Sequence, residues 1–351
     1  MALDAARAAL ADPAGLHPGP AQGLPALREA IADRYRRTAG IAVDTARIVV
    51  TPGTKYAVHT LLQTLLQPGD EVLIPTPNWF GFHQLMTRAR GATLRLLPLD
   101  AADGYALPPA AVVAALTPQT KLLILTNPGN PTGRVYALAE LNAVLAAVRA
   151  ARPDVWVLSD EIYDGITFEP SLRPAPTVLA LPDPGGRHVV INGFSKSLAM
   201  AGWRVGYVVA PPALAPVLTQ YLLDTVSGVA PLNQLAGAAA TDHFEAVTRD
   251  LLTALVPARE ALLSGLDQLG VPAFPTQGAY YAFADLRPWL PAGFASEAAA
   301  SAALLARLRD EFGLLLIDGA TCGAPGFARI TFAAPVADLR EGLRRLARGL
   351  R

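Results

Sequence analysis

The sequence predicts an α/β fold, with a mostly parallel central sheet flanked by helices and a smaller α+β unit towards the C-terminus. Short apolar runs alternate with longer amphipathic stretches over the first two thirds of the chain. This order is typical of parallel strands joined by covering helices. Beyond about residue 245 the alternation stops, and fewer strand-like runs stand between longer helical stretches. With 351 residues the chain is also long enough for two domains.

The strand-like runs of the first part are short and bounded by Pro, Gly, Asp or Asn. They are Val72–Pro75, Leu94–Leu97, Lys121–Leu125, Val155–Leu158 and His188–Asn192. Stretches with helical spacing of apolar residues lie around them, at Tyr56–Leu66, Phe82–Ala89 and Ala137–Ala151. We expect these elements to form a large domain over residues 20–245.

The remaining residues predict a smaller domain. Its expected helices are Phe244–Leu269, Glu297–Phe312 and Val336–Arg348, and its expected strands are Ala279–Phe283, Leu314–Ile317 and Ala328–Phe332. A first helix, at about Leu3–Leu10, precedes the large domain. We expect residues 1–19 and 246–351 to make up this small domain.

Composition and charge exclude several classes of protein. The 29 basic and 29 acidic residues balance, so there is no cationic field for nucleic acid or an anionic membrane surface. The single cysteine, Cys322, and five scattered histidines offer no metal-ligand spacing. No apolar run is long enough to span a membrane, and charged residues stand where a signal peptide would be apolar. The sequence therefore predicts a cytoplasmic protein without a metal site.

Lysine is rare in this chain, so lysine chemistry has three candidates, Lys55, Lys121 and Lys196. Lys196 follows the strand-like run His188–Asn192, and α/β sheets bind ligands at the carboxyl ends of such strands. Its small and apolar neighbours favour desolvation, which helps an amine to lose its proton and form a Schiff base. Arg204 follows between two glycines, within reach of an anion near Lys196. By spacing alone, a solvated lysine at a strand end is an equal alternative.

The run Asn192–Gly206 resembles, at every defined position, the pyridoxal-phosphate attachment signature of class I aminotransferases, in the aspartate aminotransferase superfamily. Further matches follow in family order at Gly23–Ile31, Thr51–Lys55, Pro77–Phe80, Asn127–Gly133, Ser159–Tyr163 and Arg329. The resemblance covers nearly the whole chain. It implies a fold-type-I enzyme with pyridoxal 5'-phosphate as its cofactor, and a homodimer with active sites at the subunit interface.

The resemblance implies that Gly53, Thr54 and Lys55 bind the phosphate of the cofactor, together with Arg204 and Ser195. The first three open a predicted helix, whose N-terminal backbone N–H groups suit an anion. Many loops begin a helix in this way, so the local pattern is weak by itself. Many family members carry serine three residues before the lysine, where this chain has glycine, and Ser195 is expected to compensate.

Four residues match the family positions around the cofactor ring. Trp79 is expected to stack on the ring, Asn130 to donate to its phenolic oxygen, and Tyr163 to share that oxygen. Asp160 is expected to pair with the pyridine nitrogen and keep it protonated, so that the ring accepts electrons when a substrate bond breaks. Taken singly, a core tryptophan, a Pro/Gly turn and a capping carboxylate at a strand end are simpler interpretations of these residues.

Arg329 matches the arginine that binds the substrate carboxylate, with Trp79 and Asn130 beside it. A guanidinium offers two parallel N–H donors to a carboxylate, so it fixes orientation as well as affinity. Dicarboxylate-specific relatives bring a second cation to the distal carboxylate, and Asp224–Val229 contains none. Aspartate is therefore disfavoured as the main donor, and apolar or aromatic side chains fit the surroundings of Trp79 better.

The resemblance implies transfer of an amino group between an L-amino acid and a 2-oxo acid. Lys196 is expected to hold the cofactor and then move the α-proton as general base and acid, with Asp160 and Tyr163 completing the catalytic set. The main alternative is a pyridoxal-phosphate-dependent lyase, either a C–S β-lyase or an enzyme like aminocyclopropane-carboxylate synthase, because the same residues serve both. A cofactor-binding regulator and a truncated, non-catalytic relative are further alternatives.

Two departures from the family concern the beginning of the chain. The tyrosine that reaches the phosphate in the partner subunit has no match, because Leu16 and His17 stand in its place. The first helix is expected almost at Met1, whereas members usually carry an arm and a glycine loop before it. These departures affect closure over the substrate and the dimer contact.

Overall fold

The computed structural model of the chain describes residues 1–11 and 17–351. The helices of this part are α1 (Ala2–Ala11), α2 (Pro25–Ala39), α3 (Thr54–Leu65), α4 (Phe80–Met86), α5 (Pro109–Ala115), α6 (Leu138–Ala151), α7 (Ala215–Thr225), α8 (Pro231–Thr241), α9 (Phe244–Gln268), α10 (Glu297–Phe312) and α11 (Val336–Gly349). Its strands are β1 (Ile48–Thr51), β2 (Glu71–Thr76), β3 (Thr93–Pro98), β4 (Thr120–Thr126), β5 (Trp156–Asp160), β6 (His188–Gly193), β7 (Gly206–Val209), β8 (Tyr281–Asp285), β9 (Ile317–Asp318) and β10 (Phe327–Thr331).

The first seven strands form one sheet in the order β1-β7-β6-β5-β4-β2-β3. Neighbours from β6 to β3 pair in parallel, whereas β7 runs antiparallel to both β1 and β6. The predicted mostly parallel sheet is therefore confirmed. From β4 the later strands extend to one side and the earlier strands β2 and β3 to the other, so the chain order reverses between β4 and β2.

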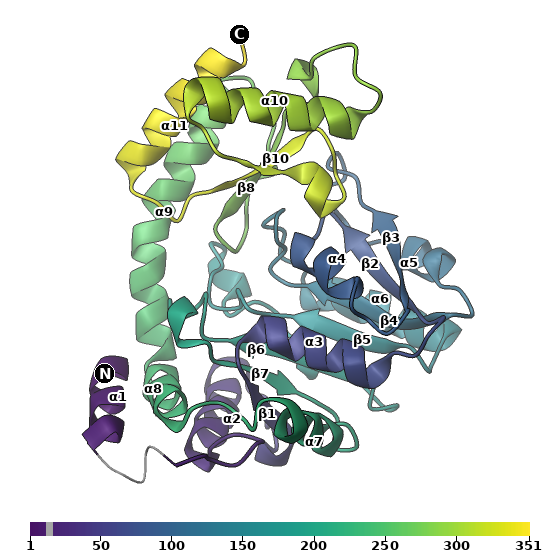
Figure 1. Cartoon of the computed structure of the whole chain (residues 1–351), viewed down its shortest axis with the longest axis vertical. Helices are drawn as coiled ribbons and strands as arrows, with labels where there is room; N and C mark the ends of the chain where they lie inside the picture. Colours follow the sequence, from purple (N-terminus) through teal and green to yellow (C-terminus); the bar gives the residue numbers. More distant parts are fainter. Residues whose placement is uncertain (12–16) are drawn as a thin grey trace.

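Both faces of this sheet are buried, which explains the nearly continuous apolar runs in the sequence. Side chains alternate along a strand, and in β5 Val157 packs into one buried cluster while Trp156 and Leu158 pack into another. Helices α2, α5, α6 and α8 supply the first cluster, and α3, α4 and α7 supply the second. The sheet thus lies between two layers of helices (Figure 1).

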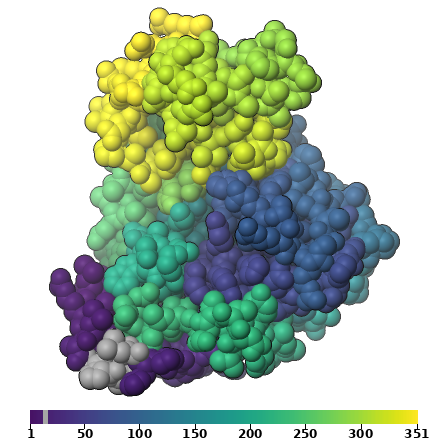
Figure 2. Space-filling view, viewed as in Figure 1, coloured from purple at the N-terminus to yellow at the C-terminus, as the bar shows by residue number. Residues whose placement is uncertain are grey.

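The smaller lobe holds a three-stranded antiparallel sheet in the order β8-β10-β9. Helices α10 and α11 and the end of α9 cover it around a separate buried cluster. Figure 2 shows the yellow C-terminal residues in the upper lobe, above the blue residues of the large sheet. The predicted α+β unit is therefore confirmed, and α9 connects the two lobes (Figure 1).

One predicted strand is much shorter than expected. Residues Leu314–Ile317 have a strand-like composition, but β9 contains only Ile317 and Asp318, which pair with β10. Leu315 is 75% exposed, so this run does not complete a buried ladder. Composition predicted the strand correctly only where a partner strand lies beside it.

Helix α1 lies beside the large lobe in this structure. It packs against α8, and Ala6 belongs to a buried cluster of the large sheet, although residues 1–19 are expected in the small domain. The division at residues 20–245 stays a prediction. No helix in the described ranges combines the length and apolar content of a bilayer span.

Candidate active site

The predicted site residues gather at one edge of the large sheet, where the strands end. Trp79 follows β2, Asn130 follows β4 and Lys196 follows β6, while Asp160 is the last residue of β5 and Tyr163 comes just after it. The carboxyl ends of parallel strands meet at one edge, and a reversal of strand order opens a crevice there. The reversal between β4 and β2 stands within this group of residues.

Lys196 lies half-buried in the turn after β6. Its Nζ is 5.3 Å from the ring centroid of Tyr280 and 5.9 Å from that of Tyr163. The positive charge of Lys196 favours the charged form of Asp160 and so opposes the rise that burial gives to the pKa of that carboxyl. The amine of Lys196 thus lies beside two aromatic rings and within electrostatic reach of a buried carboxyl.

An anion-binding cradle lies at the beginning of α3. Gly53 has a φ of 83°, which favours glycine, and a Cβ added to it would stand 2.5 Å from Nη2 of Arg204 and displace the guanidinium from its present position. Nη1 of Arg204 donates to the carbonyl of Ala201 at 2.8 Å. The first N–H groups of a helix have no partner within it, so those of Thr54 and Lys55 and this cation converge as a phosphate requires. The cradle therefore fits the phosphate of the cofactor.

Two neighbouring buried carboxyls at the end of β5 have different surroundings. Oε1 of Glu161 accepts from Oγ of Ser159 at 2.9 Å and from the N–H of Val178 at 3.1 Å. Oδ1 of Asp160 accepts from the N–H of Ile162 at 3.2 Å. Burial raises the pKa of Asp160 to about 7 and that of Glu161 to about 8. Asp160 retains capacity for a cationic N–H donor, such as a protonated pyridine nitrogen, which would favour its charged form.

A pair of phenols lies beside Lys196. The hydroxyl of Tyr163 is 2.9 Å from that of Tyr281, and burial raises the pKa of Tyr163 well above its ordinary value. Tyr280 packs edge-on against Tyr163, with ring centroids 5.5 Å apart. Tyr281 was not among the predicted site residues. Its signal was the tandem Tyr280-Tyr281, of which the second residue begins β8, and both rings contact that of Tyr163.

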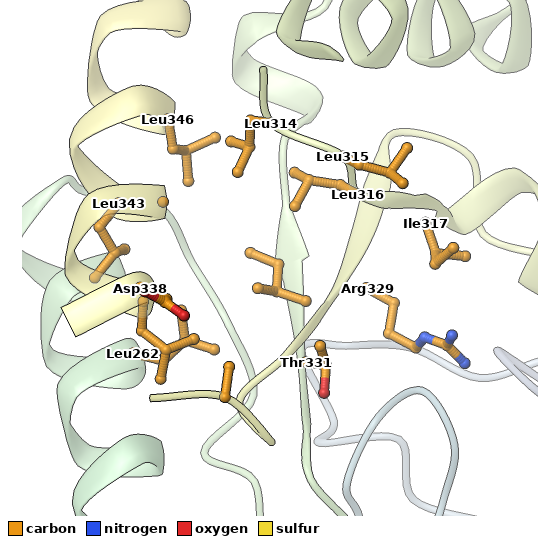
Figure 3. Close-up of a pocket in the computed structure, with 14 residues that line it drawn as sticks. Leu262, Leu314, Leu315, Leu316, Ile317, Arg329, Thr331, Asp338, Leu343 and Leu346 are labelled. Atoms are coloured by element: carbon orange, nitrogen blue, oxygen red, sulfur yellow. The ribbon is translucent and has the colours of Figure 1, made fainter. Parts of the chain in front are cut away.

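Arg329 brings the small lobe into the site. It lies in β10, and its Nη1 donates to Oδ1 of Asn130 at 2.9 Å. Its guanidinium carbon is 4.4 Å from the ring centroid of Tyr281. Figure 3 shows this side chain extending away from Leu314 and Leu343, which line an apolar pocket of about 410 Å³ in the small lobe. The guanidinium therefore faces the site between the lobes.

Trp79 lies half-buried just before α4. Its ring contacts Phe82 edge-on, with centroids 5.2 Å apart, and Nζ of Lys55 is 5.4 Å from its centroid. Ser195 is half-buried one residue before Lys196. Of the two residues that stand in place of the family's tyrosine, His17 is exposed and Leu16 is outside the described residues.

The doubly covered sheet, with its candidate site where the strand order reverses, is the architecture of the fold-type-I enzymes that depend on pyridoxal phosphate. The family model for aminotransferase class I and II matches residues 2–346. The chain belongs to this family. It is an aminotransferase that depends on pyridoxal phosphate and acts on amino acids and 2-oxo acids.

Similar proteins agree with this assignment over the full chain. The aspartate/prephenate aminotransferase of Thermus thermophilus is 35% identical, over 99% of this chain and 86% of the relative. The aspartate aminotransferase of Geobacillus stearothermophilus is 32% identical, over 94% and 82%. The solved structure of the Rhizobium meliloti aspartate aminotransferase has a TM-score of 0.91 at 27% identity, covering 99% of this chain and 87% of that chain. The predicted family, fold and cofactor are therefore confirmed.

Proposed function

We propose that Lys196 is the Schiff-base lysine of this aminotransferase. The convergence of Lys196, Asp160 and Arg329 at one sheet edge supports this proposal. When bound, the cofactor supplies an acceptor for the electrons released at the α-carbon of the substrate. The residues that would hold it are Gly53, Thr54, Lys55, Ser195 and Arg204 at the phosphate, Asp160 at the ring nitrogen, Asn130 and Tyr163 at the phenolic oxygen, and Trp79 at the ring face.

The chain's own residues perform binding, orientation and proton transfer. Arg329 binds the α-carboxylate through its fork of N–H donors and so fixes the α-carbon. The amine of Lys196 takes the α-proton as general base and returns it as general acid. Tyr163, Tyr280 and Tyr281 surround this amine and limit the access of water.

The substitution Arg329→Lys is expected to lower kcat/KM about 10- to 100-fold for every amino donor. Lysine keeps the charge but loses the two parallel donors, and it leaves Oδ1 of Asn130 without its present partner. Initial rates over a range of donor concentrations measure the effect. Arg287→Lys is the matched control, since Arg287 pairs with Asp285 on the outside of the small lobe. Equal kinetics for the two variants would contradict the assignment of Arg329.

We propose that acidic amino acids are among the donors. The relatives support this, since that from Thermus thermophilus is an aspartate/prephenate aminotransferase and that from Geobacillus stearothermophilus is an aspartate aminotransferase. The ammonium of exposed Lys55 stands over Trp79 and is available to a second carboxylate. This proposal opposes the expectation drawn from Asp224–Val229, and kinetics decide between them.

The first experiment loads the purified enzyme with pyridoxal phosphate and adds single amino acids without any oxo acid. We expect aspartate to convert the visible absorbance band to a near-ultraviolet band, with one oxo acid released per site. Phenylalanine and alanine serve as aromatic and apolar comparisons. A visible band that persists while oxo acid and ammonia accumulate would favour the lyase, and a higher efficiency with phenylalanine would favour the aromatic donor.

We propose that the enzyme works as a homodimer. Exposed apolar side chains on and after α7, those of Val217, Leu223 and Val226, support a surface that another subunit covers. Light scattering on the purified protein gives the mass of the assembly and tests this proposal. The cytoplasmic location stays a prediction.

A further inference from the structure

A buried charged network adjoins the turn that carries Lys196, and none of its residues belongs to the proposed site. Its centre is Asp164, in the loop after β5. Oδ2 of Asp164 accepts from Nη2 of Arg34 at 2.8 Å and from Nδ2 of Asn192 at 2.9 Å. Oδ1 accepts from Oγ of Ser197 at 3.1 Å. The side chains of Asp164 and Arg34 are each 6% exposed, so this charge pair is withdrawn from water.

Ser197 connects this network to the catalytic lysine, because it is the next residue along the chain. Its hydroxyl accepts from the N–H of Gly165 at 3.1 Å while it donates to Asp164. A Cβ on Gly165 would stand 3.1 Å from Cβ of Ser197 and 2.5 Å from Cγ2 of Thr248. Glycine therefore permits the turn after β6 to lie tightly against the loop after β5.

Arg34 anchors the other end of the network. It projects from α2, and its guanidinium carbon lies 4.7 Å from the ring centroid of Tyr35 and 4.5 Å from that of Phe244, the first residue of α9. A buried carboxylate requires a partner charge and full hydrogen bonding. The pair thus connects the turn that carries Lys196 to α2 and to the first turn of α9.

We propose that Asp164 is a positioning residue for Lys196 and acts through the hydroxyl of Ser197. The network fixes the backbone from which the lysine side chain extends, and hence the position of its amine relative to Asp160 and Tyr163. Proton transfer needs this geometry, since a displacement of about 1 Å costs up to about 100-fold in rate. Asp164 itself touches neither substrate nor cofactor. This inference rests on the proposed assignment of Lys196.

The substitution Ser197→Ala tests the proposal without breaking the buried ion pair. We expect kcat to fall about tenfold while KM changes less than about twofold. Without the hydroxyl of Ser197 the nitrogen of Lys196 is held less firmly relative to its neighbours. The pH midpoint of the visible absorbance of the loaded enzyme is therefore expected to shift by about half a pH unit or more. The groups facing Lys196 are Asp160, Tyr163, Tyr280 and Tyr281, and none of them is changed.

Ser197→Thr keeps the hydroxyl and is expected to recover most of the lost activity and the absorbance midpoint. Asp164→Asn keeps the shape but removes the charge, and it is expected to lower kcat at least as much as Ser197→Ala. Thr248→Val is the matched control. It removes a buried hydroxyl on the other side of Gly165 that donates to the carbonyl of Phe244 at 2.8 Å, and it is expected to change only the melting temperature.

A Ser197→Ala enzyme with unchanged kcat and unchanged absorbance midpoint would overturn the positioning role, whatever its melting temperature. Lys196→Ala separates this result from a failure of the proposed function. If borohydride reduction still attaches the cofactor covalently to that variant, the assignment of Lys196 is wrong and the inference fails with it. If the attachment is lost while Ser197→Ala matches Thr248→Val, only the positioning role is overturned.

Discussion

Replacing Lys196 with alanine is expected to lower kcat for transamination by at least about 10⁴-fold. The variant loses both the amine that carries the cofactor and the group that moves the α-proton. Of the three lysines, all within the described residues, only Lys196 has its amine over the rings of Tyr163 and Tyr280. The measurement is the initial rate of oxo-acid formation with excess amino donor and pyridoxal phosphate.

Lys121→Ala is the matched control for this experiment, because Lys121 lies in β4, outside the proposed site. We expect it to keep wild-type kcat. Added small primary amines are expected to restore part of the activity of Lys196→Ala, with a rate proportional to amine concentration, since a free amine can act as the missing base. Full activity in Lys196→Ala would remove the lysine from the mechanism.

The substitution Asp160→Asn is expected to lower kcat by about 10²- to 10³-fold, the range found when one preorganised electrostatic partner is removed. An amide cannot balance a positive charge on the ring nitrogen, so the ring accepts electrons less well. Stopped-flow absorbance during a single half-reaction measures this loss. Glu161→Gln removes the neighbouring buried carboxyl, which is hydrogen-bonded to Ser159 and Val178 within the protein. It is expected to leave kcat within about threefold of wild type. Similar losses in both variants would contradict the assignment.

Asp160 also gives the cofactor-free enzyme a pH-dependent stability with a definite sign. Burial raises its pKa from 3.8 to about 7, so the folded state binds the proton more tightly than the unfolded chain does. Stability is then progressively lost as the pH rises from about 4 to about 7. Asp160→Asn removes this contribution, so the melting temperature of the variant relative to wild type should increase as the pH rises from about 4 to about 7. A constant difference over that range would show that the carboxyl is not held in this way.

The elements that the sequence predicted well are those with strong local signals. Runs such as His188–Asn192 are apolar at their centre, Val189–Ile191, because helices cover both faces of the sheet, and polar or turn residues mark their ends. The positions of Asp160 and Lys196 at one sheet edge were predictable for the same reason. Parallel strands bring their carboxyl ends together, so residues that follow such strands become neighbours.

Other features depend on contacts that no local pattern contains. Strand β7 spans only Gly206–Val209 and begins at the last residue of the signature run Asn192–Gly206, so it carries no separate boundary signal. The apolar run from Leu314 lacks a paired strand for most of its length. The bonds from Tyr163 to Tyr281 and from Asp164 to Arg34 join residues far apart in the chain, and only the folded topology brings them together.

The hydrogen bond from Arg329 to Asn130 has a consequence for the polarity of the amide. Because the guanidinium only donates, it fixes Oδ1 of Asn130 on its own side, and the amide nitrogen then points its two hydrogens the other way. On the proposed assignment, that is the side of the phenolic oxygen. On this assignment Arg329, which binds the substrate carboxylate, also sets the orientation of the Asn130 amide, which holds the cofactor. A carboxylate that binds Arg329 therefore acts on this amide through one hydrogen bond, without any movement of the backbone.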